Sequence, residues 1–242
     1  MTGGKASLLA VFAHPDDETF RPGGTLALLA RKGVKVHLLT ATRGEAGSRG
    51  DPPVCEAKDL ADMRERELRC ACAALGLEPP RVLNYEDGHL READPGAARA
   101  DILAFMGEVR PHVVLTFGAD GLSGHPDHIA IGRFTVQAYA ANDHVAALYT
   151  LAVPRSLAEQ LEMRQVHSVP DEQIALRVDV TPAWEVKKAA MNCHMTQRTS
   201  TPLISAPEER QRLFFGRELF ALAGYRAPES DFMPALLKEY SL

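Results

Sequence analysis

The chain has 242 residues, only four cysteines, no long apolar run and little net charge. Cys55, Cys70, Cys72 and Cys193 form no Cys-x-x-Cys pair. A chain of this size does not need a disulfide framework, so we expect free thiols. No apolar run approaches the length of a membrane span. The formal net charge of -5 gives no basic surface for nucleic acid or for an anionic membrane.

The composition is typical of a soluble globular protein. Hydrophobic residues make up 45% of the chain and charged residues 24%. α/β chains of this length commonly form one unit, so we predict a single domain over residues 1–242. The apolar run at 8–13 is too short for a signal peptide, and a cytoplasmic location is expected. The oligomeric state is open, and a homo-oligomer is compatible with the sequence.

Apolar runs alternate with helical patterns along the chain. The predicted strands cover 7–13, 34–42, 81–85, 112–117, 146–153 and 174–180. The predicted helices cover 23–32, 57–75, 97–109, 127–141, 182–195 and 207–222. A tail at 226–242 is expected to wrap the surface. This alternation of strands and helices predicts an α/β, Rossmann-like fold with a mostly parallel sheet and helices on both faces.

Four polar clusters each follow a predicted strand. They cover 14–18, 43–49, 86–89 and 119–128. In open α/β sheets, ligands bind outside the carboxyl ends of the strands. We therefore expect these four loops to meet at one edge of the sheet and to form the functional site.

The first cluster reads His14-Pro15-Asp16-Asp17-Glu18. A neutral imidazole and a carboxylate three residues apart, His14 and Asp17, suit one zinc ion. Three acidic residues directly after a buried strand are costly unless something compensates their charge, and a divalent cation would do so. A solvated loop with helix-capping aspartates is the alternative.

The second cluster reads His125-Pro126-Asp127-His128 and begins a predicted helix. Its loop should bring His128 close to His14 and Asp17. Two histidines and one carboxylate with an open fourth position describe a catalytic zinc site better than a structural one. His125 is then free for catalysis. Histidines at a helix start are more often caps, but two such clusters after two strands favour the metal.

Together, the two motifs closely resemble those of the PIG-L/LmbE-like zinc deacetylases. This family includes N-acetylglucosaminyl-phosphatidylinositol deacetylases and the deacetylases of mycothiol and bacillithiol synthesis. Three further segments resemble family motifs and extend the resemblance over much of the chain. They are the Gly-Glu-rich loop at 43–47, the Arg-x-x-Glu-Leu helix at 64–68 and the segment at 188–197, which ends His-Met-Thr-Gln.

The resemblance implies a role for each residue of the two main motifs. The implied ligands of one Zn²⁺ per chain are His14, Asp17 and His128. Asp16 would be the general base. His125 would be the imidazolium that stabilises the oxyanion, and Asp127 would orient it.

The resemblance implies less about the substrate. Arg64 would contact the substrate, and Glu45 would line the pocket. For His194 and Gln197, a place in the site and a purely structural role are equally compatible with the pattern. The chain also departs from the family at Arg21, where relatives usually carry a small residue. This arginine could recognise a carboxylate or phosphate at the mouth of the site, but a solvated position is the simpler interpretation.

The function expected from these residues is hydrolysis of an N-acyl group, most simply N-acetyl, on an amino sugar or a similar small molecule. A thiol-conjugate amidase with the same zinc chemistry is one alternative. A non-catalytic metal-binding module is another, although such a module would be expected to have lost Asp16 or His125. A dinucleotide-binding enzyme is disfavoured, because no Gly-x-Gly-x-x-Gly follows the first strand.

Overall fold

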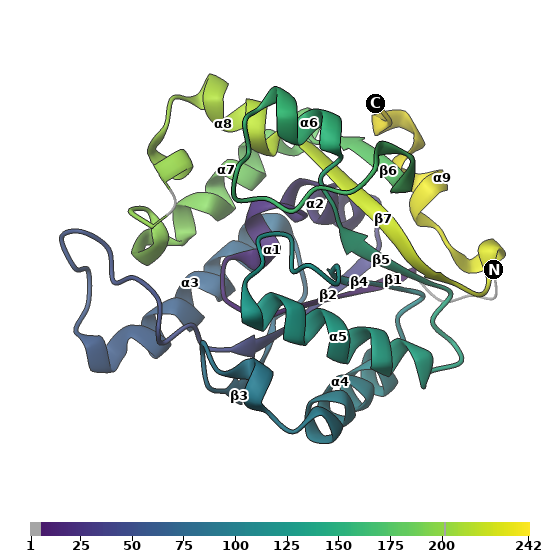
Figure 1. Ribbon diagram of the computed structural model, residues 1–242, viewed down its shortest axis with the longest axis horizontal. Helices are drawn as coiled ribbons and strands as arrows, with labels where there is room; N and C mark the ends of the chain where they lie inside the picture. Colours follow the sequence, from purple (N-terminus) through teal and green to yellow (C-terminus); the bar gives the residue numbers. More distant parts are fainter. Residues whose placement is uncertain (1–5, 201) are drawn as a thin grey trace.

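The computed structural model describes residues 6–200 and 202–242. These residues form an α/β structure around a twisted sheet of seven strands (Figure 1). Its order is β3-β2-β1-β4-β5-β7-β6. Five strands are parallel: β1 (Ser7–Phe12), β2 (Lys35–Thr42), β3 (Arg81–Tyr85), β4 (Val113–Phe117) and β5 (Ala147–Leu151). β6 (Ile174–Asp179) and β7 (Arg217–Tyr225) complete it with antiparallel pairs. The predicted α/β class with a mostly parallel sheet is confirmed.

Helices pack in two groups on the two faces of the sheet. The longer helices are α2 (Gly23–Arg31), α3 (Leu60–Leu75), α4 (Pro95–Val109), α5 (Pro126–Ala140), α7 (Trp184–Cys193) and α8 (Glu208–Phe215). The shorter ones are α1 (Asp17–Phe20), α6 (Arg155–Gln160) and α9 (Met233–Leu237). α4 packs beside α5 against β1, whereas α2, α3 and α7 pack together on the opposite side (Figure 1). Within the described ranges, no helix combines the length and the apolar content needed to cross a membrane.

The central strands are buried on both faces. Every residue of β1 and of β4 is buried, as expected for parallel strands covered by helices on each side. This explains their continuous apolar sequences, SLLAVF and VVLTF, which do not alternate with polar residues. The core therefore surrounds the middle of the sheet, and polar side chains gather where these strands end.

The strand β7 corrects the expectation of a helix over 207–222. Helix α8 ends at Phe215, and Gly216 separates it from β7. β7 fills the gap between β5 and β6 and pairs with both in antiparallel register. Pairing with two open strand edges overrides the weak local preference for helix in this segment.

The cysteines give a second correction. Cys70 on α3 and Cys193 at the end of α7 form a disulfide across a sequence separation of 123 residues. The expectation of free thiols was wrong for this pair and holds for Cys55 and Cys72. α3 and α7 pack against each other, which brings the two Cα atoms to 5.8 Å. Sequence spacing gives no sign of that contact.

The tail at 226–242 does more than wrap the surface. Phe232, Met233 and Leu237 are buried in the main core, and α9 contacts α2. Close to the chain end, Ser241 forms a bridge with Val178 of β6. The tail is thus part of the packed structure.

Candidate active site

The four predicted loops meet at the carboxyl edge of the sheet around a cavity of about 390 Å³. Residues that follow β1, β2, β3 and β4 line this cavity, together with one residue of α3 and two from the segment after α7. The lining comprises His14, Asp16, Asp17, Ala46, Gly47, Arg64, Asp87, Gly88, His125, His128, Gln197 and Ser200. Larger hollows of about 760 and 750 Å³ lie elsewhere. The second is lined by His37, Glu108, His112 and His144, but within the described residues these do not form a group close enough to hold one metal ion.

One nitrogen of His14, one nitrogen of His128 and the two carboxylate oxygens of Asp17 lie close together in this cavity. Nδ1 of His14 lies 3.2 Å from Nε2 of His128. The same nitrogen of His128 lies 3.2 Å from Oδ1 of Asp17. Nδ1 of His14 and Oδ2 of Asp17 are 3.7 Å apart. Zinc bonds of about 2.0–2.1 Å in tetrahedral geometry place donor atoms about 3.3 Å apart. The residues present therefore fit a divalent metal such as zinc.

The remaining ring nitrogens of both histidines are already engaged. Nε2 of His14 lies 3.2 Å from a carboxylate oxygen of Asp127 and 3.1 Å from one of Asp87. Nδ1 of His128 lies 3.1 Å from the carbonyl oxygen of Gly121 and donates to it. These acceptors favour a proton on the outer nitrogen of each ring, so the inner nitrogen offers its lone pair whenever the ring is neutral. This is the arrangement that metal-binding histidines adopt.

Two triples have one ligand atom from each residue with all three atoms within 4.8 Å of one another, namely His14 with His125 and His128, and His14 with Asp87 and Asp127. The set of His14, Asp17 and His128 differs from them, because Asp17 turns one oxygen to each histidine. In the second triple, both oxygens of Asp127 accept backbone N–H groups, from Gly88 at 2.7 Å and Leu90 at 3.1 Å. The first triple lacks a carboxylate to balance the metal charge. We therefore prefer the set that includes Asp17, whose Oδ1 faces His128.

Neighbouring charges and hydrogen bonds favour the protonated form of His14 and the ionised form of Asp17. Burial lowers the pKa of His14, but hydrogen bonds to Asp127 and Asp87 outweigh it and raise this pKa to about 10. Burial likewise raises the pKa of Asp17, yet His128 and His14 hold it well below its usual range. The metal-free site thus pairs a carboxylate with a protonated imidazole, and a bound cation would replace that proton.

Asp16 lines the same cavity as His14 and Asp17 and has an uncommon backbone conformation. Its φ is 122° and its ψ is -26°, in a region that residues with a side chain rarely adopt. Such a conformation costs of the order of 1–3 kcal/mol and persists only when neighbours hold it. Burial raises the pKa of Asp16 to about 6, although the charge of Arg64 lowers it. A carboxylate of this kind can accept and return a proton near neutral pH.

Arg64 supports the loop that carries Asp16. This nearly buried arginine donates hydrogen bonds to the carbonyl oxygens of Gly44, at 2.9 Å, and Pro15, and it pairs with Asp16 at 3.2 Å. Gly44 and Gly47 pack so closely on the guanidinium that a Cβ on either would overlap it. The Gly-rich loop after β2 therefore fits around Arg64. Arg64 lines the cavity and is largely committed to these protein partners.

His125 and Asp127 do not interact as the family resemblance implied. Nδ1 of His125 accepts the backbone N–H of Asp127 at 3.2 Å, which leaves Nε2 to carry the proton. The Asp127 carboxylate turns instead to His14, Gly88 and Leu90. Burial, followed by the charges of His14 and His128, lowers the pKa of His125. His125 is thus oriented by the backbone amide of Asp127 and not by its carboxylate.

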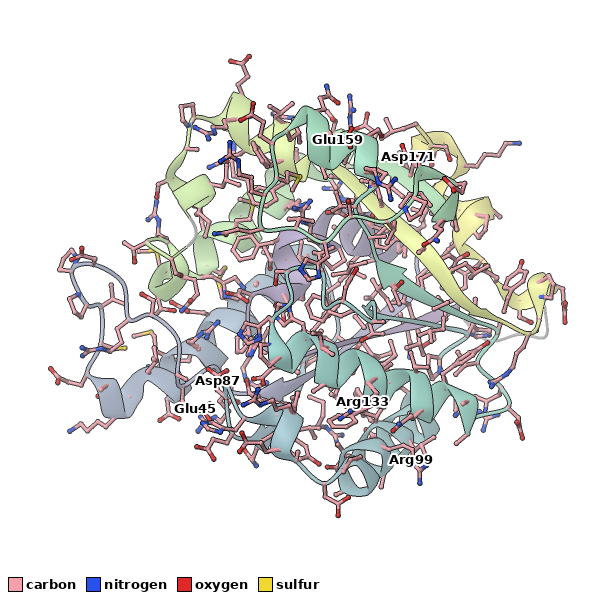
Figure 2. All side chains as sticks on the ribbon, viewed as in Figure 1. Glu45, Asp87, Arg99, Arg133, Glu159 and Asp171 are labelled. Atoms are coloured by element: carbon pink, nitrogen blue, oxygen red, sulfur yellow. A yellow bond between two sulfur atoms is a disulfide. The ribbon has the colours of Figure 1, made fainter. Side chains whose placement is uncertain are left out.

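Asp87 is the residue that the sequence interpretation missed. It belongs to the cluster at 86–89, but only the tertiary structure brings it to His14. Its other oxygen accepts the backbone N–H of Ala46 at 2.9 Å. Glu45, expected in the pocket, is exposed and accepts the backbone N–H of Asp87 at 3.0 Å. Figure 2 shows Glu45 and Asp87 side by side, where they join the loops after β2 and β3.

The three residues left open by the sequence differ in position. Gln197 lines the cavity and donates to the carbonyl oxygen of Ser48 at 3.0 Å. His194 is fully buried behind the cavity, with its Nε2 2.8 Å from Oε1 of Glu18. Arg21 is partly buried and lies outside the cavity lining, and its guanidinium donates to the carbonyl oxygen of Phe214 at 3.4 Å.

Comparison with known proteins decides the family. The family described as PIG-L, GlcNAc-PI de-N-acetylase, matches residues 9–139. The chain belongs to the PIG-L family. A 1D-myo-inositol 2-acetamido-2-deoxy-alpha-D-glucopyranoside deacetylase of Acidothermus cellulolyticus is 36% identical over 267 residues, covering 93% of this chain and 91% of the relative. The PIG-L match includes both His-Pro-Asp motifs, and this relative is an amide hydrolase that acts on an N-acetyl group.

Solved PIG-L-like structures share the fold at lower identity. N,N'-diacetylchitobiose deacetylase from Pyrococcus horikoshii has a TM-score of 0.67 and 22% identity, covering 93% of this chain and 88% of its own. The 4-carboxy-2-hydroxymuconate hydratase GalB from Pseudomonas putida also has a TM-score of 0.67, with 21% identity and coverage of 92% and 98%. Since a hydratase shares this fold, the function must be argued from the site.

Proposed function

We propose that this PIG-L protein hydrolyses the N-acetyl group of a 2-acetamido-2-deoxy sugar in a zinc-dependent reaction that yields acetate and a free amine. The observation that carries the proposal is the trio of inward-facing donors on His14, Asp17 and His128, with a carboxylate, Asp16, beside it in one polar cavity. The substrate class is supported by the relative at 36% identity, whose name specifies a 2-acetamido-2-deoxy-glucopyranoside.

The hydrogen bonds indicate which residues would bind the metal and which would orient the metal ligands. His14, Asp17 and His128 would hold the zinc ion, one per chain. When bound, zinc supplies a Lewis acid that lowers the pKa of water and polarises the amide carbonyl. Asp127 and Asp87 keep the His14 ring in the orientation and tautomer that a metal requires.

Asp16 acts as the general base in this proposal. Its carboxylate takes a proton from the water molecule as the water oxygen attacks the amide carbon. It then returns that proton to the nitrogen of the leaving amine, so that the C–N bond breaks and the carboxylate is restored. The raised pKa of Asp16, about 6, suits both transfers. Arg64 holds the carboxylate in place and faces the cavity, where it is also the proposed substrate contact.

His125 stabilises the charge that develops on the carbonyl oxygen. Its Nδ1 is occupied by the amide of Asp127, so Nε2–H is the group available for donation to that oxygen. A neutral donor suffices for this role. The Asp127 carboxylate orients His14, and its backbone N–H orients His125. Glu45 holds Asp87 in position by accepting its backbone N–H. Gln197 and Ser200 line the cavity and are the proposed contacts for sugar hydroxyls.

A panel of N-acetylated amines tests the function. Zinc-loaded protein is incubated with N-acetylglucosamine, its α-inositol glycoside, N,N'-diacetylchitobiose, an N-acetyl amino acid and the amide of a thiol conjugate, and the free amine is measured. We expect amine release from the sugars, its loss with a chelator and a fall of roughly 10² to 10⁴ in turnover for Asp16→Asn. Release from thiol conjugates alone would favour the thiol-conjugate amidase. Full turnover in Asp16→Asn would remove Asp16 as the base.

Two further expectations stay proposals. A single domain over residues 1–242 agrees with the continuous sheet, and the oligomeric state is untested. The cytoplasmic location is also a prediction, and the Cys70–Cys193 disulfide weighs against it, because disulfides persist mainly in oxidising compartments.

A further inference from the structure

The loop that presents Asp16 needs an internal support. The positive φ of Asp16, 122°, is uncommon for a residue with a side chain, and it sets the direction of the carboxylate relative to the metal ligands. Arg64 holds the side chain of Asp16 and the carbonyl of Pro15. The backbone N–H of Asp16 must be held by a different group.

Glu18 is that group. Its side chain is fully buried, and Oε2 accepts the backbone N–H of Asp16 at 2.9 Å. The other oxygen, Oε1, accepts the hydroxyl of Thr19 and lies 2.8 Å from Nε2 of His194. A buried carboxylate is costly unless hydrogen-bond donors surround it, and these three donors supply that environment. Glu18 does not line the cavity, and its hydrogen-bond partners are Asp16, Thr19 and His194.

His194 reaches Glu18 from the far end of the chain. Its ring is fully buried, and its Nδ1 has no hydrogen-bond partner within the described residues. The polar contacts of the ring are therefore those of Nε2, with Glu18 and, at 3.4 Å, with the hydroxyl of Thr19. The segment after it is fastened to α3, because Glu67 accepts both the N–H of Thr196, at 2.8 Å, and its hydroxyl, at 2.6 Å.

We propose that Glu18 and His194 form a positioning pair that holds the backbone of Asp16 in the conformation required for proton transfer. His194 orients the carboxylate of Glu18, and Glu18 fixes the N–H of Asp16. The pair touches neither the cavity nor the metal ligands' donor atoms. The inference rests on the proposed function, since it assigns its effect to Asp16 as the base.

The pair should act on the chemical step more than on binding. A displacement of about 1 Å at a catalytic group can lower turnover by about 10². We expect Glu18→Ala to lower kcat by roughly 10², with KM changed less than about threefold and zinc retained. Glu18→Gln keeps an oxygen for the N–H of Asp16 and should retain most of the turnover. His194→Ala should lower kcat by roughly tenfold, because Glu18 stays in place but loses its orienting partner.

Two thermodynamic cycles separate this role from simple destabilisation. If His194 acts through Glu18, His194→Ala should cause no further loss of kcat in the Glu18→Ala protein. If Glu18 acts through Asp16, Glu18→Ala should change kcat less than about threefold in the Asp16→Asn protein. Each variant is also assayed for zinc by elemental analysis and for its melting temperature.

Glu218 provides the matched control. Like Glu18, it is buried, lies outside the cavity lining and accepts backbone N–H groups, from Gly24 at 2.8 Å and Thr25 at 2.7 Å, but its side-chain partner is Lys187 and it has no hydrogen bond to Asp16. Glu218→Ala and Glu218→Gln should lower the melting temperature while kcat of the folded protein is unchanged. If Glu18→Ala does not fold, the Gln variant and a cycle of His194→Ala with Asp16→Asn carry the test, and His194→Ala should then change kcat less than about threefold in the Asp16→Asn protein.

The outcomes divide cleanly. Loss of kcat that disappears in the Asp16→Asn background supports the positioning pair. Equal losses in both backgrounds, loss of zinc from Glu18→Ala, or an equal loss of kcat in Glu218→Ala overturns it. A slow Asp16→Asn protein with normal Glu18→Ala turnover overturns this inference alone, whereas full turnover in Asp16→Asn refutes the proposed base.

Discussion

At the scale of single residues, the proposed metal site has three ligands, and we expect each of them to be needed. His128 brings one donor nitrogen and is oriented by the carbonyl of Gly121. His128→Ala leaves His14 and Asp17, and two ligands make a poor zinc site. We expect the purified wild type to retain about one zinc per chain after dialysis and this variant to retain almost none, as measured by elemental analysis. His89→Ala, at an exposed histidine outside the cavity, is the control. Stoichiometric zinc in His128→Ala would refute the ligand assignment.

Asp127 tests the surroundings of the metal site. Its two oxygens accept from His14, Gly88 and Leu90, and an amide in its place loses one acceptor. Replacing a partner that orients a metal-binding histidine typically costs 10- to 100-fold in metal affinity. We therefore expect Asp127→Asn to weaken zinc binding by about that factor, as measured by competition with a chromophoric chelator. If zinc affinity is unchanged and the pH profile of kcat shifts, Asp127 acts on His125 and does not support His14.

At the scale of elements, the disulfide joins α3, which carries Arg64, to α7, which leads to His194 and Gln197. It closes a long loop, with a sequence separation of 123 residues, and such a crosslink stabilises mainly by restricting the unfolded chain. We expect Cys70→Ser/Cys193→Ser to lower the free energy of unfolding by about 2–4 kcal/mol and Tm by roughly 5–10 °C. Differential scanning fluorimetry with and without dithiothreitol measures this. Dithiothreitol should lower Tm of the wild type but not of the double variant. An equal decrease of Tm in both proteins would show that the Cys70–Cys193 disulfide is not the stabilising feature.

At the scale of the whole molecule, zinc binding should stabilise the fold in a pH-dependent way. In the metal-free protein the pKa of His14 is raised to about 10, so His14 holds a proton between pH 6 and 8 and zinc must displace it. Asp17 is already ionised in this range because its pKa is lowered. Zinc affinity should therefore rise about tenfold per pH unit, and the zinc-induced increase in Tm should grow from pH 6 to pH 8. Titration calorimetry in buffers of different ionisation enthalpy should detect about one released proton. If zinc raises Tm by the same amount at pH 6 and at pH 8, the predicted displacement of a proton from His14 is wrong.

The sequence determined those features that arise from neighbouring residues. Buried strands such as β1 and β4 are continuous apolar runs, so their place and parallel pairing could be predicted. The two His-Pro-Asp motifs follow such strands, and the carboxyl ends of parallel strands share an edge. The gathering of His14, Asp17 and His128 in one cavity follows from that rule, and residue spacing alone was enough to suggest it.

The tertiary structure decided the features that depend on contacts between distant segments. β7 became a strand because two strand edges were open beside it, and Cys70 met Cys193 because α3 packs on α7. The hydrogen-bond partners were decided in the same way: the Asp127 carboxylate turned to His14, and Asp87 joined it. A buried polar group takes the donors that packing places around it, and a linear motif lists residues without stating which donors those will be.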